Sequence, residues 1–281
     1  MLRVLPVFML AAATAVPSAW AQDRARLRLV SEADALVPGT TAWLGFAFEL
    51  DPDWHLYWNG ANDTGFPIKI TPELPAGFEA GEMVWPIPRR HVSPGDLLDH
   101  IYEKRVTLLL PVKVPSDAQP GSKVKFAASG EWLVCKSACI AGSAEVSLTL
   151  PIAAPGSTPA ATPEAALFSE ARANLPRALR ADQPEVRVIW TKEGAKLELV
   201  GGKKAAFYPA TDCSPIKGLI ESGITETGVF NLNFEKPESG DRIEGVVHVD
   251  PQSSGRPTVY FIRAARANQP GPGASNPPVG K

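Results

Sequence analysis

The chain has 281 residues, of which 44% are hydrophobic, which is enough to bury a substantial core in one or two domains. Its formal net charge of −2 gives no sign of a surface for nucleic acid or for an anionic membrane. The 28 prolines and 23 glycines favour short strands and frequent turns over long helices.

The first 21 residues have the features of a secretory signal peptide. Arg3 supplies the positive start, residues 5–16 are mostly apolar, and Ala19-Trp20-Ala21 has the small residues of a cleavage site. The apolar run is too short and too interrupted by proline for a membrane span, although a retained anchor is the alternative. We therefore expect a mature chain that begins at Gln22, is exported and soluble, does not span the membrane, and lies where disulfides persist.

Residues 22–152 have the pattern of an all-β domain. Turn sequences such as Val37-Pro38-Gly39 separate short alternating or aromatic segments, which favours a β-sandwich, with an eight-stranded barrel as the alternative. Within the aromatic run, alternation places Trp54 and Trp58 on one face, where we expect core packing, and Tyr57 on the other. The predicted strands are 27–30, 41–50, 54–58, 66–70, 78–85, 106–114, 124–134 and 144–150.

A linker and a second, smaller β-rich domain follow. Residues 153–163 are rich in proline, alanine, serine and threonine, as in a linker. Thr162, Pro163 and Glu164 then form a helix start, so the second domain, residues 164–263, should begin with one helix. Its strands are expected at 186–190, 196–200, 205–208, 228–234, 243–249 and 258–262, and residues 264–281 are expected to be a disordered tail.

Two cysteines near the end of the first domain are candidates for chemistry. Cys135 and Cys139 are separated by three residues between two strand-like segments, so a short turn could bring their sulfurs together. A bond across so short a loop removes little loop entropy, which favours a role other than stabilisation. The residues alone leave three interpretations open: a redox-active pair, a structural staple, or a Cu(I) or Zn site made of soft thiolates. The third cysteine, Cys213, is expected to be a partly buried bystander or to pair between chains.

Several motifs occur in a fixed order along residues 27–152. They are Trp54-His55-Leu56-Tyr57-Trp58-Asn59, Asp63-Thr64-Gly65-Phe66-Pro67, Trp85-Pro86-Ile87-Pro88, Tyr102-Glu103, Leu109-Leu110-Pro111-Val112 and Trp132-Leu133-Val134-Cys135 through Cys139-Ile140-Ala141-Gly142. This ordered set resembles the periplasmic N-terminal (alpha) domain of the thiol:disulfide interchange protein DsbD family, in its ScsB-like branch. Phe207-Tyr208-Pro209 resembles the second periplasmic part of ScsB-like proteins more loosely.

The resemblance implies a function as well as a fold. It implies an immunoglobulin-like sandwich in the periplasm whose redox-active disulfide is its only cofactor. Matching positions make Cys139 the attacking or attacked sulfur and Cys135 the resolving one, with Tyr57, Tyr102 and Glu103 at the border of the site.

The resemblance also implies partners. The domain would relay reducing equivalents from a separate membrane-embedded thiol reductase to thioredoxin-fold proteins, in copper tolerance or cytochrome c maturation. The alternatives are a non-catalytic binding or assembly module with a structural disulfide, and a Cu(I)-binding protein.

Overall fold

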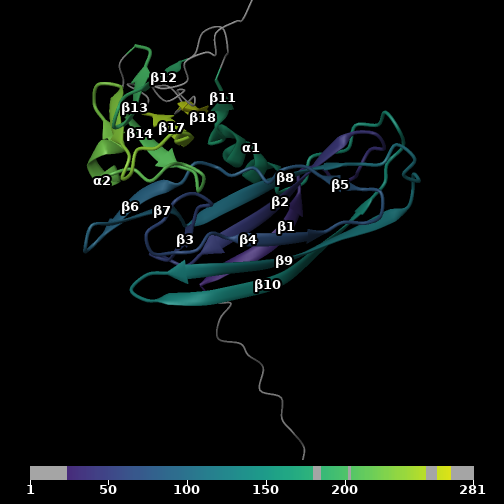
Figure 1. The fold of residues 1–281 in the computed structure, drawn as a ribbon. Helices are drawn as coiled ribbons and strands as arrows, with labels where there is room; N and C mark the ends of the chain where they lie inside the picture. The colour runs from purple at the N-terminus through teal and green to yellow at the C-terminus, as the bar shows by residue number, and fades with distance from the viewer. Residues whose placement is uncertain (1–23, 180–184, 202–203, 251–257, 267–281) are drawn as a thin grey trace, which may run out of the picture.

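The protein is built from β-strands that form two sandwiches in sequence (Figure 1). The computed structural model describes residues 24–179, 185–201, 204–250 and 258–266. The predicted signal peptide and most of the predicted tail lie outside these residues. Within them, no helix is long and apolar enough to cross a membrane.

The first sandwich is the immunoglobulin-like domain that the sequence predicts. Its two sheets share no strand, so the fold is a sandwich and not a closed barrel. Their facing sides enclose a core that includes Phe46, Leu56, Leu108 and Phe126. The first sheet has the strand order β1 (Ala25–Ser31), β2 (Thr41–Leu50), β8 (Arg105–Lys113), β5 (Glu79–Ala80). The second sheet has the strand order β10 (Cys139–Pro151), β9 (Lys123–Cys135), β3 (His55–Tyr57), β7 (Leu97–Glu103), β6 (Arg89–Ser93). Strand β4 (Lys69–Glu73) also pairs with β9.

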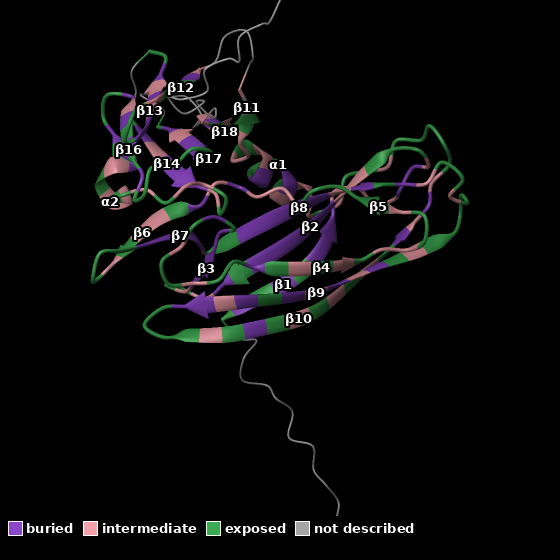
Figure 2. Ribbon diagram, in the orientation of Figure 1, coloured by how far each residue is buried: buried purple, intermediate pink, exposed green. Residues whose placement is uncertain are grey.

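The outer face of the first sheet is covered by helix α1 (Ala165–Ala173). Phe168 and Ala171 are buried against Val30, Ala47 and Leu109. This explains why the central strands β2 and β8 are buried along most of their length, whereas the edge strand β10 alternates between exposed and covered residues (Figure 2). The helix predicted to begin the second domain thus packs on the first.

The predicted linker is extended and hydrogen-bonded to the first domain. The amide of Asp34 donates to the carbonyl of Ala160 (2.9 Å), and the amide of Thr162 donates to the carbonyl of Glu32 (3.0 Å). Residues 160–162 therefore run beside residues 32–34 before the chain enters α1.

The second domain has its own apolar core, which includes Phe207, Phe230 and Ile243. It also contains the short helix α2 (Leu219–Ser222). One sheet has the order β11 (Arg177–Ala178), β18 (Thr258–Ala265), β17 (Arg242–Val249), β14 (Ala205–Pro209), β15 (Ile224–Thr225); the other has the order β12 (Val186–Trp190), β13 (Gly194–Leu199), β16 (Val229–Asn233).

The second domain contacts the first at the end where β3, β6 and β7 lie (Figure 1). The guanidinium of Arg90 donates to the carbonyls of Phe207 (3.2 Å) and Leu219 (2.8 Å). The ring of Tyr208 packs against Trp58 and His100 of the first domain. Buried aromatic contacts of this kind, together with a charged donor on backbone carbonyls, fix one domain against the other.

Candidate functional site

The two cysteines lie at the end of the long β9–β10 hairpin. Cys135 is the last residue of β9, Cys139 is the first of β10, and the register places them directly opposite each other. Their Cα atoms are 4.1 Å apart and the sulfurs are bonded. The disulfide that the short turn suggests is therefore present.

The two sulfurs differ in accessibility. Cys135 is only 3% exposed, because it packs with Tyr57 and Ile101 under the sheet surface. Cys139 is exposed. Since thiol–disulfide exchange requires in-line access to one sulfur, a visiting thiol meets Cys139 first.

A tyrosine hydroxyl lies beside the accessible sulfur. The Tyr57 hydroxyl is 3.9 Å from the Cys139 sulfur, 3.3 Å from Nε2 of His55 and 3.5 Å from the Thr64 hydroxyl. Burial raises the pKa of Tyr57, so the hydroxyl keeps its proton and can donate it in a hydrogen bond.

A buried carboxylate stands behind that hydroxyl. Asp99 is 1% exposed and accepts two hydrogen bonds from Thr64, one from its hydroxyl (2.5 Å) and one from its amide (3.0 Å). Because the Thr64 hydroxyl donates to Asp99, its oxygen is left to accept from Tyr57. Asp99, Thr64, Tyr57 and Cys139 thus form one polar chain from the interior to the accessible sulfur.

A histidine occupies the strand next to the disulfide. His55 is directly opposite Cys135 on one side and Glu103 on the other, so the three residues form a row across β9, β3 and β7. Burial, and then the nearby His91, lower the pKa of His55, although Asp99 and Glu103 act in the opposite direction. A neutral imidazole can accept a hydrogen bond from Tyr57.

Comparison with known proteins assigns the first sandwich to a family. Residues 25–151 match the family described as "Thiol:disulfide interchange protein DsbD, N-terminal". The first sandwich is a DsbD N-terminal domain.

Solved structures extend the likeness beyond that domain. The N-terminal periplasmic domain of ScsB from Proteus mirabilis superimposes with a TM-score of 0.57 at 13% identity, covering 90% of this chain and 96% of that one. The fold of both sandwiches is therefore ScsB-like. The reduced N-terminal domain of Neisseria meningitidis DsbD is also similar, at 9% identity and a TM-score of 0.26, covering 47% of this chain and 89% of that one. No curated protein sequence matches the chain.

Of the three residues expected at the border of the disulfide site, two lie on its side of the sheet and one lies in the core. Tyr57 contacts Cys139. Glu103 lies on the disulfide's face of the sheet, beside His55, and forms an ion pair with Arg89.

Tyr102 does not join them, which corrects that expectation. It is opposite Leu56 in the register, and strand alternation turns both residues toward the sandwich core. There the Tyr102 hydroxyl donates to the carbonyl of Pro86 (2.6 Å).

Three polar residues of the site were not among the predicted site residues: His55, Thr64 and Asp99. Alternation alone would have placed His55 on the face of Tyr57, and Asp99 on the face of Glu103. Thr64 lies in a loop, so only the fold could bring it to Asp99.

The remaining cysteine is separate from the pair. Cys213 is a free thiol in the second domain, and burial raises its pKa to about 11. Such a thiol is protonated at neutral pH and is a poor nucleophile. Among the residues that the structure describes, no group of three or more histidine, cysteine or acidic side chains is arranged to hold a metal ion.

Proposed function

We propose that this chain is a periplasmic thiol–disulfide exchange protein that passes reducing equivalents through Cys139 and Cys135 to thioredoxin-fold partners. The observation that carries the proposal is the asymmetry of the pair: an exposed Cys139 is bonded to a buried Cys135, with a tyrosine hydroxyl beside the exposed sulfur. Membership of the first domain in the DsbD N-terminal family supports the same reaction class.

The reaction proceeds by two displacements. In the reduced chain, the Cys139 thiolate attacks one sulfur of the partner's disulfide, forming a mixed disulfide and releasing the partner's other sulfur as a thiolate. The Cys135 thiolate then attacks the Cys139 sulfur, the remaining partner sulfur leaves, and the Cys135–Cys139 bond forms again. The partner gains two electrons and the chain loses two.

The neighbouring polar groups assist the exposed sulfur. The protonated Tyr57 hydroxyl donates a hydrogen bond to the Cys139 sulfur whenever that sulfur carries negative charge, as attacking or as leaving group. Because Thr64 gives its only hydroxyl proton to Asp99, it can accept from the Tyr57 hydroxyl but cannot donate to it, so the Tyr57 proton is free to turn from Thr64 to a charged Cys139 sulfur. His55 is the alternative acceptor for the Tyr57 proton when the disulfide is closed.

The electrons come from outside the chain in this proposal. A dithiol of a separate membrane-embedded reductase reduces the Cys135–Cys139 bond by the same two displacements in reverse. Copper tolerance or cytochrome c maturation is the process served, as in the family that the sequence motifs resemble.

Trapping of the mixed disulfide tests the proposal. In a Cys213→Ser background, Cys135→Ser leaves the exposed Cys139 without its resolving partner, so a thioredoxin-fold substrate should stay attached through a reducible bond. The matched control, Cys139→Ser, leaves only the buried Cys135 and should trap little. Structural disulfides typically have reduction potentials below about −300 mV. Equilibration of the unaltered protein with a glutathione buffer should therefore give a reduction potential above that range. A potential below that range, with no adduct from Cys135→Ser, would mean that the bond is a staple.

A further inference from the structure

We propose that His55 is the proton acceptor for the Cys139 thiol, and that the Tyr57 hydroxyl passes the proton between them. The inference rests on the proposed exchange function and adds to it the step that activates the attacking sulfur. It concerns the reduced protein, in which Cys139 must lose its thiol proton before it can attack a disulfide.

The three side chains are close enough for such a relay. Strand alternation puts His55 and Tyr57 on the same face of β3, and the Tyr57 hydroxyl lies 3.3 Å from Nε2 of His55. The same hydroxyl lies 3.9 Å from the Cys139 sulfur. Because His55 is only 7% exposed, this hydroxyl rather than bulk water is its route to the sulfur.

The proton transfer balances within these groups. The Cys139 thiol gives its proton to the Tyr57 oxygen, while the Tyr57 hydroxyl proton passes to Nε2 of His55. Burial raises the pKa of Tyr57, which disfavours a tyrosinate, so both protons move together. The products are a thiolate, a neutral tyrosine and an imidazolium. The imidazolium then donates to the tyrosine oxygen, and the tyrosine donates to the thiolate.

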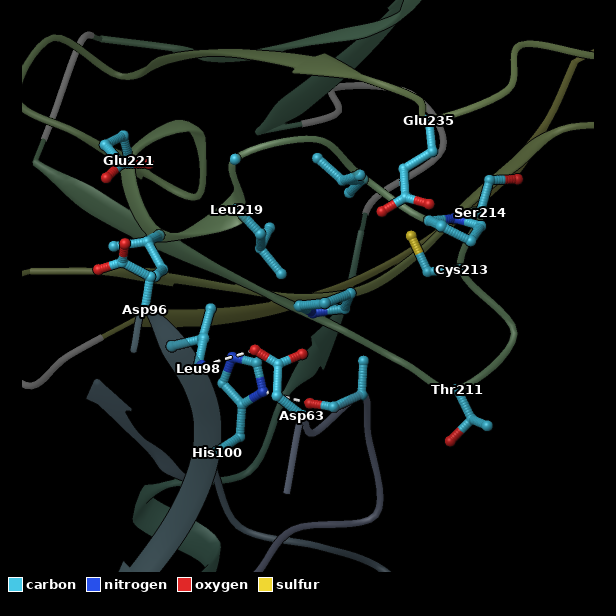
Figure 3. Close-up of a pocket in the computed structure, with 16 residues that line it drawn as sticks. Asp63, Asp96, Leu98, His100, Thr211, Cys213, Ser214, Leu219, Glu221 and Glu235 are labelled. Atoms are coloured by element: carbon cyan, nitrogen blue, oxygen red, sulfur yellow. Dashed lines mark hydrogen bonds between the residues drawn. The ribbon is translucent and has the colours of Figure 1, made fainter. Parts of the chain in front are cut away.

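The loop beside the Tyr57 hydroxyl does not compete for this role. The amide of Leu98 donates to the Asp63 carboxylate (2.6 Å), which holds the residue before Thr64 in place (Figure 3). Thr64 gives its own hydroxyl proton to Asp99. It therefore has no proton to offer the Tyr57 oxygen, which stays open to the thiol, and a hydroxyl is a far weaker base than an imidazole.

The groups around His55 leave it neutral but able to take up a proton. Burial, and then His91 on β6, lower the pKa of His55, while Asp99 and Glu103 on β7 act in the opposite direction. The ring centroids of His55 and His91 are 5.2 Å apart, and Glu103 is also ion-paired with Arg89. A new negative charge on the sulfur adds to the two carboxylates and favours the imidazolium.

The cation nearest to the cysteines in sequence is less suited to activate the thiol. Lys136 follows Cys135 directly, but its ammonium is 2.9 Å from the carboxylate of Asp53 and both side chains are well exposed. Its charge is thus compensated and screened by water, whereas the His55 imidazole is enclosed beside the site.

Alkylation by iodoacetamide measures the Cys139 thiolate without any partner protein. The chain has three cysteines, so Cys135→Ser/Cys213→Ser in the full chain leaves Cys139 as the only thiol. In this background, His55→Gln keeps a hydrogen-bonding side chain that cannot titrate. It should make alkylation at neutral pH about tenfold slower, with the same plateau rate well above the usual thiol pKa of about 8.5.

A double variant separates a relay from two independent effects. Tyr57→Phe removes the bridge, so His55→Gln/Tyr57→Phe should react no more slowly at neutral pH than Tyr57→Phe alone. The matched control is His248→Gln, which removes another histidine whose pKa burial lowers, in the second domain. It should leave the pH profile of Cys139 unchanged. Losses that multiply in the double variant overturn the relay.

NMR titration of the His55 ring nitrogens in the unaltered full chain gives a second readout. Because thiolate and imidazolium stabilise each other, His55 should titrate at a higher pH in the reduced protein than in the oxidised protein. Alkylation of Cys139 should remove this difference. This measurement keeps the proposal testable if His55→Gln does not fold.

Two results overturn the proposal: a pH profile of Cys139 that His55→Gln leaves unchanged, or a His55 titration that is the same in both redox states. If Cys135→Ser still traps a thioredoxin-fold partner alongside either result, the exchange function stands and only the role of His55 is wrong. A failure to trap, with both effects of His55 present, would have the opposite meaning.

Discussion

Replacement of Tyr57 by phenylalanine should slow disulfide exchange without unfolding the site. The substitution removes one hydroxyl that lies 3.9 Å from the Cys139 sulfur and leaves the ring packed against Cys135 and Ile101. A hydrogen bond to a charged group contributes about 1.5–3 kcal/mol. Because sulfur is a soft acceptor and the separation is long, the lower end of that range applies. A loss of about 1.4 kcal/mol corresponds to a tenfold slower reaction.

Stopped-flow measurement of the reduced protein against a small aromatic disulfide gives this rate directly. Tyr102→Phe is the matched control, because it deletes the same atom from a tyrosine whose hydroxyl bonds the Pro86 carbonyl in the core. It should lower the free energy of unfolding by about 1 kcal/mol and leave the exchange rate unchanged. An equal rate for Tyr57→Phe and the unaltered protein would refute the role assigned to this hydroxyl.

Three further outcomes follow from the fold. Because the cysteines are four residues apart, reduction of their bond should lower the free energy of unfolding by only about 2 kcal/mol on a chain-entropy estimate. Circular dichroism of the reduced protein checks this, and loss of the folded state would indicate a structural staple. Phe168→Ala should lower that free energy by about 3–5 kcal/mol in urea titration, because the ring is 0% exposed between α1 and the sheet, whereas the exposed Ser169→Ala should change it little. The unfolded chain protonates His100 below about pH 6.5 and the folded chain only near pH 4, so stability should fall by about 3 kcal/mol as the pH drops through this window. His55 and His248, whose pKa values burial also lowers, add to this slope, so His100→Asn should flatten the stability–pH curve only partly; an unchanged curve would contradict the assignment.

Local patterns were sufficient to predict the sandwich. The strand β2 begins and ends at the predicted residues, and β12 does so in the second domain, because both are uninterrupted runs of β-favouring residues. Alternation in the aromatic run also placed Trp58 in the core and Tyr57 on the opposite face, as the structure has them.

The elements that complete the site could not be predicted from local sequence patterns. Strands β6 and β7 (Arg89–Ser93 and Leu97–Glu103) were missed because β7 is buried on both faces and carries Asp99 and His100 inside, so it shows no apolar alternation. Burial of these polar residues depends on partners distant in sequence, such as Thr64, which local patterns do not reveal. The helix was predicted, but its docking on the first sandwich depends on Phe168 finding a sheet face far away in the chain.

The loop that carries Thr64 is anchored from both domains. The amide of Ala61 donates to the carbonyl of Pro209 (3.0 Å), while Thr64, three residues later, holds Asp99. The family match ends at residue 151, yet the loop beside the exposed Cys139 sulfur is held by backbone near residue 210. The segment that the family model matches is thus smaller than the structural unit around the disulfide, and excising the first sandwich would remove part of the support of the loop that carries Thr64.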